Sequence, residues 1–199
     1  MKKRTFLATT MTAVALAGHA PWVAAQTYPT KPVRLVVPFA PGGTTDIVAR
    51  VVAERANAAL GQTLVVENKA GGGGSIGALE VIRAAPDGYV LGMATVSTTA
   101  ANPAINAKIG YNPTTDFTPI INVAATPHVI PLHPSFPARD YNRFLADLKK
   151  NPVPGNPPKR TAGGIGHLQM ELFKSLSGTF ITHIPYRGAG PALNDTVAG

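Results

Sequence analysis

Two glycine-rich segments of the chain have the composition and position of anion-binding loops. The first, Pro-Gly-Gly-Thr-Thr-Asp at 41–46, follows the apolar run at 33–39, and the second, Asn-Lys-Ala and four glycines at 68–74, follows the apolar run at 64–67. Backbone N–H groups at the start of a helix have no helical partner and lie at the positive end of the helix dipole, so they stabilise carboxylates and phosphates. The spacing predicts anion binding through backbone donors. Glycines that only permit tight turns and close helix packing would give the same pattern.

Alternating strands and helices are expected to position these loops. The two apolar runs are typical of strands buried in a parallel sheet. Apolar residues at helical spacing predict helices over 47–60 and 76–82, and residues 89–94 are expected to form a third strand. Crossovers of this length require parallel strands, so the sequence predicts a doubly wound α/β sheet with both loops at the carboxyl ends of its strands. Open α/β sheets bind ligands at that edge.

The first predicted helix has signals at both ends. Thr45 or Asp46 would cap its first turn, and Gly61 supplies the stop. We expect Asp46 to organise the loop and not to contact an anionic ligand, because a bare carboxylate repels one.

Residues that could perform catalysis do not occur in recognisable patterns. His128, His133, His167 and His183 lack metal-ligand spacing with carboxylates, and no Gly-x-Ser-x-Gly motif occurs. The chain has no cysteine, which excludes thiolate metal sites and disulfides. We therefore expect no enzymatic activity and no bound metal.

A nucleotide cofactor is also disfavoured. Gly72, Gly74 and Gly77 match the Gly-x-Gly-x-x-Gly fingerprint, but no acidic residue ends the third strand to hold a ribose, and Asp87 comes too early. Lys69 lies beside a glycine loop without the rest of a phosphate-loop motif. The sequence predicts no cofactor.

The first 25 residues have the layout of a cleaved signal peptide. Residues 2–4 are Lys-Lys-Arg, residues 6–17 are mostly apolar, and Val-Ala-Ala at 23–25 supplies small residues for cleavage after Ala25. The apolar run is too short to span a membrane, and the alternative is an N-terminal anchor. Removing this segment takes three basic and no acidic residues from the formal net charge of +8, leaving +5. Because the remaining basic residues are scattered, we expect small anions and no nucleic acid as partners.

The C-terminal half is expected to repeat the order of the first half, in which a strand is followed by a glycine loop and a helix. A proline-rich connector separates its first helix from its glycine loop. The expected elements are strands at 116–125 and 129–132, a helix at 141–150, the connector at 151–159, the loop at 161–166, a helix bearing Leu168, Leu172, Phe173 and Leu176, and a strand at 180–185.

Several segments together resemble the substrate-binding proteins of tripartite tricarboxylate transporters, the Bug or TctC family of periplasmic receptors. The resemblance covers residues 28–199. It implies a type II periplasmic-binding-protein fold, with two doubly wound α/β lobes at 26–126 and 127–199 that close on a small carboxylated solute. It also implies delivery of that solute to membrane permease subunits, without catalysis. The matching segments are 33–50, 67–81, 85–95, 167–178 and 182–195.

The same resemblance implies which residues form the binding site around the solute. They fall in the two glycine loops, after the third strand, in the third glycine loop and at the exit of the last expected strand. They are Pro41, Gly42, Gly43, Thr44, Asp46, Ala70, Gly71, Gly72, Gly73, Gly74, Ser75, Thr95, Ser97, Thr98, Thr161, Ala162, Gly163, Gly164, Tyr186, Arg187 and Gly188.

The chain departs from the family pattern at two places. The loop between Thr161 and His167 is shorter than in the family, and family members continue beyond the segment that ends here at Gly199. We therefore expect a second lobe that is incomplete in this chain. A sensory or scaffold relative that does not serve transport, or a defective truncated fragment, is the alternative function.

Overall fold

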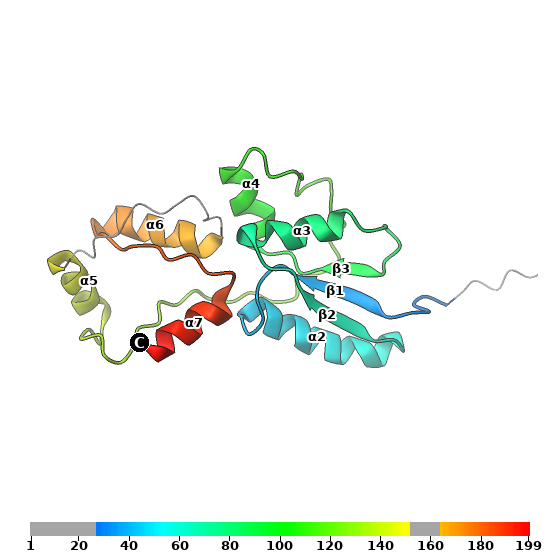
Figure 1. Ribbon diagram of the computed structural model, residues 1–199, viewed down its shortest axis with the longest axis horizontal. Coiled ribbons are helices and arrows are strands. Elements are labelled where there is room, and N and C mark those ends of the chain that lie inside the picture. Colours follow the sequence, from blue (N-terminus) through cyan, green and yellow to red (C-terminus); the bar gives the residue numbers. More distant parts are fainter. Residues whose placement is uncertain (1–26, 152–163) are drawn as a thin grey trace, which may run out of the picture. The chain divides into compact units, whose positions relative to one another are not determined.

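The computed structural model describes residues 27–151 and 164–199, and the chain divides into a unit of residues 1–30 and a unit of residues 31–199. The second unit contains all the elements named here. Its first part alternates strands and helices (Figure 1). In chain order these are β1 (Val33–Val37), α2 (Thr44–Leu60), β2 (Leu64–Asn68), α3 (Ser75–Ile82) and β3 (Val90–Gly92). This order confirms the predicted α/β alternation.

The three strands form one parallel sheet in the order β2-β1-β3. Val33 of β1 pairs with Leu64 of β2, and Arg34 of β1 pairs with Val90 of β3. Helices α2 and α3 lie on opposite faces of this sheet (Figure 1). The doubly wound arrangement is therefore confirmed, and the loops after β1 and β2 leave the carboxyl ends of neighbouring strands.

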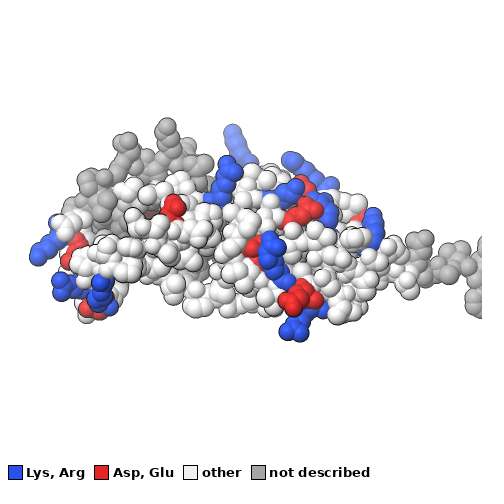
Figure 2. All heavy atoms as spheres, turned by 60° about the horizontal axis from the view of Figure 1, so that its bottom comes forward, with Lys and Arg blue, Asp and Glu red and all other residues white. Residues whose placement is uncertain are grey.

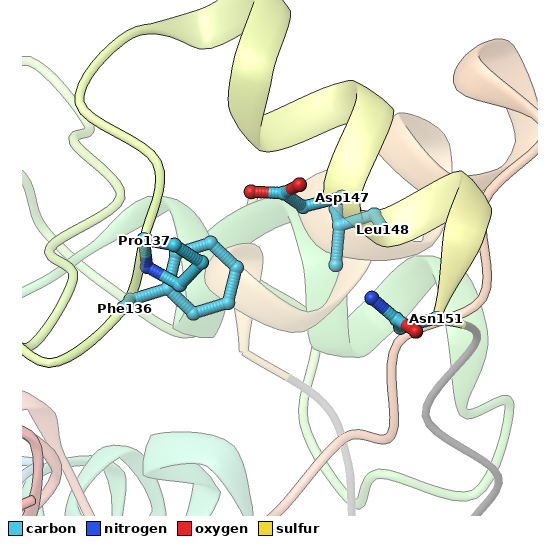
Figure 3. Close-up of a pocket in the computed structure, with 5 residues that line it drawn as sticks. All are labelled: Phe136, Pro137, Asp147, Leu148 and Asn151. Carbon is cyan, nitrogen blue, oxygen red and sulfur yellow. The ribbon is translucent and has the colours of Figure 1, made fainter.

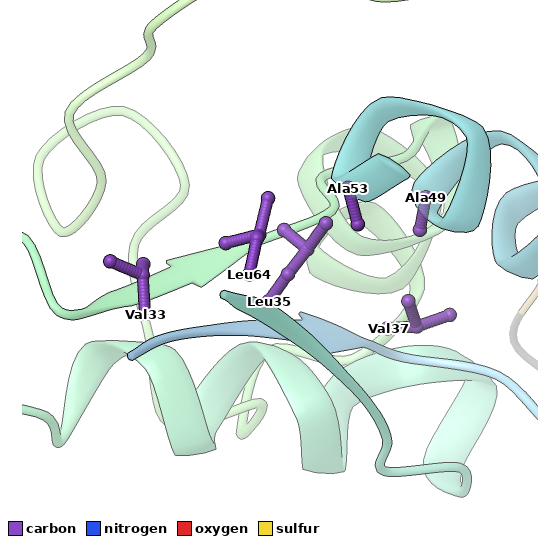
Figure 4. Packing of buried hydrophobic residues seen from close by; sticks show 6 residues of the cluster. All are labelled: Val33, Leu35, Val37, Ala49, Ala53 and Leu64. Carbon is purple, nitrogen blue, oxygen red and sulfur yellow. The ribbon is translucent and has the colours of Figure 1, made fainter. Parts of the chain in front are cut away.

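The core of this sheet lies between β1, β2 and α2. Leu35, Val37 and Leu64 pack with Ala49 and Ala53 of α2, and all five side chains are buried (Figure 4). The alanines let the helix approach the sheet closely, while each buried valine or leucine contributes roughly 1.5–3 kcal/mol. This packing fixes α2, and with it the loop that precedes α2, against the sheet.

The two ends of α2 differ in how well the sequence predicted them. Gly61 ends the helix in the left-handed conformation (φ +63°), as predicted. The N-cap is Gly43, so the expected cap at Thr45 or Asp46 was wrong. Because the helix already begins at Thr44, Asp46 lies inside the first turn, and its carboxylate reaches back to the amide of Gly42.

The C-terminal part of the unit is helical where its elements are described. The 141–150 helix is confirmed as α5 (Tyr141–Lys150), which begins at the N-cap Asp140. The helix after the third glycine loop is confirmed as α6 (Ile165–Ser177). The other two helices are α4 (Asn102–Ile105), which follows a π-helical turn at Ser97–Ala101, and α7 (Ala189–Ala198).

The strands expected at 116–125, 129–132 and 180–185 were wrong, since the described residues there pair with no neighbouring strand. A strand requires a ladder partner, and apolar alternation alone does not supply one. Ile120 and Ile121 are each 77% exposed and Val129 is 79% exposed. The connector at 152–159 and the start of the third glycine loop lie outside the described residues.

The surface of the described residues carries scattered charges. On the face shown in Figure 2, Lys and Arg side chains are dispersed and several lie beside Asp or Glu. Arg34, for example, is paired with Glu67 and Glu80 at 2.8 and 2.9 Å. Among residues 27–151 and 164–199, the structure contains no helix with the length and apolar character of a membrane span.

Candidate functional site

The first loop is organised by the buried carboxylate of Asp46, whose side chain is 4% exposed. Its Oδ2 accepts hydrogen bonds from the Gly42 amide and from Arg50 Nε, each at 3.0 Å, and its Oδ1 accepts one from Asn68 Nδ2 at 2.9 Å. The hydrogen bond from Arg50 is the main cause that lowers the pKa of Asp46 to about 2, against the opposing effect of burial. Asp46 is thus ionised and fully engaged within the protein, as expected for a residue that organises the loop.

Asn68, the last residue of β2, joins the ends of the two central strands. Its Nδ2 also donates to the carbonyl oxygen of Phe39 at 3.0 Å, and its Oδ1 accepts from Arg50 Nη2 at 3.2 Å. The chain leaving β1 is therefore held by a side chain from β2, which sets the position of Pro41, Gly42 and Gly43 relative to the second loop.

The second loop depends on a run of left-handed backbone conformations. Gly71, Gly72, Gly73 and Gly74 have φ values of +141°, +56°, +63° and +101°, which side chains with a Cβ rarely adopt. Gly74 N donates to Gly71 O at 3.0 Å, and α3 begins directly afterwards at Ser75. The loop therefore delivers the chain from β2 into the N-terminus of α3 within a few residues, with Ala70 and Ser75 at its two ends.

The hydroxyl groups after β3 have partners inside the protein. Thr98 Oγ1 accepts from the Thr95 amide and donates to the Thr95 carbonyl oxygen, both at 3.0 Å. Ser97 Oγ accepts from the amide of Ile165, the first residue of α6, at 2.9 Å. Ser97 and Thr98 are 4% and 2% exposed, so both hydroxyls are buried and bonded within the protein in this conformation.

The expected contacts from the C-terminal part are only partly described. Thr161, Ala162 and Gly163 lie outside the described residues, and Gly164 is the N-cap of α6. Tyr186 is 41% exposed, and its hydroxyl donates to Asp195 Oδ2 at 2.6 Å. Arg187 is exposed, and Gly188 is the N-cap of α7.

The first loop lies directly against the start of α7. A Cβ on Gly190 would overlap the carbonyl oxygen of Pro41 and would lie 3.1 Å from the amide nitrogen of Gly43. A Cβ on Gly43 would lie 3.3 Å from the amide nitrogen of Gly190. The predicted loop at 41–44 therefore contacts the first turn of α7, directly after the predicted segment 186–188, and glycine is required at this contact.

Four helices begin at the predicted loops, and none has a side-chain cap from its N-cap residue. The N-caps of α2, α3, α6 and α7 are Gly43, Gly74, Gly164 and Gly188. By contrast, α5 begins away from these loops and is capped by the Asp140 side chain, which accepts from the Arg143 amide at 2.9 Å. The first amides of two of these helices have partners inside the protein, since Ser75 N donates to Gly72 O and Ile165 N donates to Ser97 Oγ. A helix N-terminus without a capping side chain from its N-cap residue can still bind an anion through other N–H groups of its first turn.

Two surface hollows lie elsewhere, around α5 and α6. One is about 180 Å³ and is lined by Phe136, Pro137, Asp147, Leu148 and Asn151 (Figure 3). The other is about 270 Å³ and lies between Tyr141 and Phe173. Neither is lined by a predicted binding residue. The glycine loops remain the candidate site because backbone donors bind anions without needing a deep apolar hollow.

The histidines do not form a metal centre with carboxylates among the residues that the structure describes. His167 and His183 lie 4.2 Å apart between ring centroids, and His167 Nε2 lies 3.5 Å from Glu171 Oε1. Burial and the neighbouring His167 lower the pKa of His183, which favours its neutral form.

Sequence reasoning missed three residues that shape the site: Asn68, Asn102 and Gly190. The sequence placed Asn68 in the second loop. The available signal was its position directly after the predicted strand at 64–67. Asn102 is 3% exposed and contacts the second loop from 30 residues away, for which no local pattern exists. Gly190 lies in the first turn of a helix, where its tertiary contact cannot be read from spacing.

Comparison with known proteins places the chain in a family. The model of the tripartite tricarboxylate transporter family receptor (TctC) matches residues 48–199. Protein BugT of Bordetella pertussis is 37% identical over 187 residues, which cover 94% of this chain and 57% of BugT. The chain therefore spans little more than half of this relative's length.

Three solved structures share the fold of this chain, and each covers 85% of it. One described as a periplasmic transporter is 52% identical with a TM-score of 0.80, covering 85% of this chain and 57% of its own. R. palustris Rpa4515 with adipate is 37% identical (TM-score 0.78; 85% and 56% covered), and MatC from Rhodopseudomonas palustris with bound malate is 33% identical (TM-score 0.76; 85% and 57% covered). The chain belongs to the tripartite tricarboxylate transporter receptor family of periplasmic solute-binding proteins and has its α/β fold.

Proposed function

We propose that this protein binds a small dicarboxylate in the periplasm and delivers it to the membrane permease subunits of a tripartite tricarboxylate-type transporter. The observation that carries the proposal is the set of four helix N-termini at the predicted loops, all with glycine N-caps, which supply no capping side chain of their own. At α6, Ser97 accepts from the Ile165 amide in this conformation. Each offers backbone N–H donors and the positive end of a helix dipole.

The contact between the first loop and α7 supports the same function. Gly43 and Gly190 bring the N-termini of α2 and α7 within van der Waals contact. Two helix dipoles with their positive ends close together repel each other, and an anion between or beside them would relieve that repulsion. A carboxylate is a suitable ligand because its two oxygens accept several hydrogen bonds at once.

The ligands of the relatives support a dicarboxylate. Adipate and malate, which the two relatives bind, differ in length and in hydroxylation but share two carboxylates. Backbone donors recognise the carboxylate and are indifferent to the chain that joins the two groups. We accordingly assign the class of ligand and not one compound, and we assign no catalytic role, as for the family.

We also propose the domain organisation and the location. Residues 1–25 are removed as a signal peptide, with cleavage after Ala25, and the two lobes meet near residue 126. The cationic start and small residues at 23–25 support the cleavage, and the family supports the periplasm. Mass spectrometry of osmotic-shock fluid should find a chain that starts at Gln26 and lacks the sole tryptophan, Trp22. Recovery of uncleaved chain from the membrane fraction would contradict this part.

Thermal unfolding with a panel of diacids tests the binding proposal. Adipate and malate should raise the melting temperature, whereas their dimethyl esters, which have the same carbon chains without charge, should not. Binding to the folded state alone stabilises by about 2.7 kcal/mol at a hundredfold excess over Kd. Equal shifts with acids and esters would show that the carboxylates are not what the protein recognises.

A further inference from the structure

Asn102, at the start of α4, contacts the second glycine loop through its side-chain amide. Its Nδ2 donates to the carbonyl oxygens of Gly73 at 2.8 Å and Gly72 at 3.4 Å, and it lies 3.2 Å from Ser75 Oγ. The residue is 3% exposed. One side chain therefore reaches the loop at three points from a distant part of the sequence.

The orientation of the Asn102 amide is dictated by these contacts. Its Oδ1 is buried and has no hydrogen-bond partner in the structure. Turning the amide around would place that oxygen against two carbonyl oxygens, which repel it. Leaving a buried acceptor unpaired is unfavourable by itself, so the donor contacts to the loop must outweigh it.

A buried tyrosine extends the network beneath the loop. Tyr111 is 9% exposed, and its hydroxyl donates to the carbonyl oxygen of Thr98 at 2.6 Å. Burial raises the pKa of Tyr111, and a hydrogen bond with Ser75 opposes that rise. Ser75 thus lies between Asn102 and Tyr111, and the first residue of α3 is held on two sides.

The contacts to Gly72 and Gly73 fix the direction of the loop N–H groups. In a trans peptide the N–H points opposite to the preceding C=O. The Gly72 carbonyl oxygen accepts from the Ser75 amide and from Asn102 Nδ2, so the N–H of Gly73 is directed away from both. The Gly74 N–H is already used by Gly71 O. Four consecutive glycines have little conformational preference of their own, so the loop needs an external constraint to hold this arrangement.

We propose that Asn102 is a positioning residue for carboxylate binding, which holds the second glycine loop so that the Gly73 N–H faces the ligand. This inference rests on the proposed function, because it assigns the donor for one carboxylate of the diacid. Asn102 acts through the loop and does not contact the ligand. A loop without this constraint would have to be ordered on binding, and affinity would fall accordingly.

The test compares Asn102→Asp with the matched control Asn106→Asp in the 199-residue chain. Asn106 is exposed, and its Oδ1 accepts a hydrogen bond from the Lys108 amide at 3.1 Å. An aspartate at residue 106 would accept the same hydrogen bond. At residue 102, by contrast, a carboxylate would face two carbonyl oxygens and a hydroxyl. Asn102→Ala, which removes the donor without adding charge, serves as the second variant if Asn102→Asp does not fold.

The first readout is amide hydrogen exchange in ligand-free protein. In Asn102→Asp we expect exchange at Gly74 and Ile76 to be at least about tenfold faster than in Asn106→Asp, with Lys69 and Met93 in the central sheet unchanged. Unchanged loop exchange in both residue-102 variants would overturn the proposal. This readout needs no ligand, so it tests the effect of Asn102 on the loop even if wild-type protein binds no diacid. Absence of diacid binding by wild-type protein would overturn the proposed function and not the effect of Asn102 on the loop.

The second readout is adipate affinity as a function of pH. Asn102→Asp should bind adipate about tenfold more weakly than Asn106→Asp at pH 8. Part of that loss should be recovered as pH falls. The surrounding acceptor oxygens raise the pKa of the introduced carboxyl, and its protonated form can donate a hydrogen bond as the amide does. Asn102→Ala should weaken binding without this recovery. A loosened loop with unchanged adipate affinity would overturn the role in binding.

Discussion

The amide nitrogen of Ala40 donates a hydrogen bond to the carbonyl oxygen of Arg187 at 3.0 Å. This bond joins the segment that leaves β1 to the segment that enters α7. Beside it, the backbone of the first loop passes within van der Waals contact of Gly190. The position of the α7 N-terminus therefore depends on residues that are about 150 positions earlier in the sequence.

Gly190→Ala should disrupt this contact. The new methyl group would overlap the Pro41 carbonyl oxygen, and backbone atoms cannot yield as a flexible side chain does. We expect weaker diacid binding and a loss of stability of about 1–3 kcal/mol. Gly166→Ala, inside α6 with open space around its Cβ position, is the control and should keep wild-type affinity. Equal behaviour of the two variants in calorimetry would argue against the contact.

Asp46→Asn should remove a pH-dependent contribution to stability. The folded-state pKa of Asp46 is lowered from 3.8 to about 2, so its contribution is present above pH 4 and is lost as pH falls from about 4 to 2. At neutral pH this amounts to about 2 kcal/mol. Glu54→Gln, at an exposed position of the same helix, should change little. Urea unfolding between pH 2 and 7 measures both, and an Asp46→Asn curve parallel to wild type would contradict the assignment.

His183 should make the second half of the chain acid-sensitive. Burial and His167 lower its pKa below 6.5, so its contribution to stability is complete above pH 6.5 and decreases as pH falls below that value. Glu171 opposes this shift, and Lys174 reinforces it. His183→Gln should flatten the dependence of α6 hydrogen exchange on pH between 7 and 5. His133→Gln, at a half-buried site where the ring contacts Ser135, should leave it as in wild type.

The exposed apolar residues at 118–132 should promote self-association of the 199-residue chain. Ile120 and Ile121 are each 77% exposed, and exposed large apolar side chains favour aggregation where they gather. Replacing both with Thr should lower light scattering and binding of a hydrophobic dye without lowering the free energy of unfolding. Val36→Thr, at a residue that is 1% exposed, should instead destabilise the protein. Unchanged scattering in the double variant would show that these residues are not responsible.

The first sheet could be predicted from sequence because its signals are local. Buried strands, helical periodicity and a glycine stop at Gly61 all lie within the segments that they specify. The predictions of strands at 116–125, 129–132 and 180–185 were wrong for the opposite reason. An apolar pattern does not show whether another strand lies beside the segment to pair with it. The cap of α2 was misassigned because Asp46 bonds backward to Gly42 from inside the first turn.

The glycine loops of the candidate site were found by their composition, but the residues that hold them were not. Asn68 reaches Asp46 across 22 positions, and Asn102 reaches Gly73 across 29. Such contacts arise from the packing of the sheet and leave no periodic trace in the sequence. Ser97 and Thr98 were expected to face a ligand, and in this structure their hydroxyls hold Ile165 and Thr95.

If the glycine loops bind a carboxylate through their backbone, binding must require both a charged ligand and an unobstructed first loop. Isothermal titration calorimetry of the 199-residue chain with adipate and with dimethyl adipate tests it most directly, with Gly43→Val as the variant that fills the contact at the start of α2. We predict heat of binding for adipate with wild type, none for the ester, and none for adipate with Gly43→Val. Adipate binding by Gly43→Val with wild-type affinity, or equal binding of acid and ester, would show that the backbone of these loops does not bind the carboxylate.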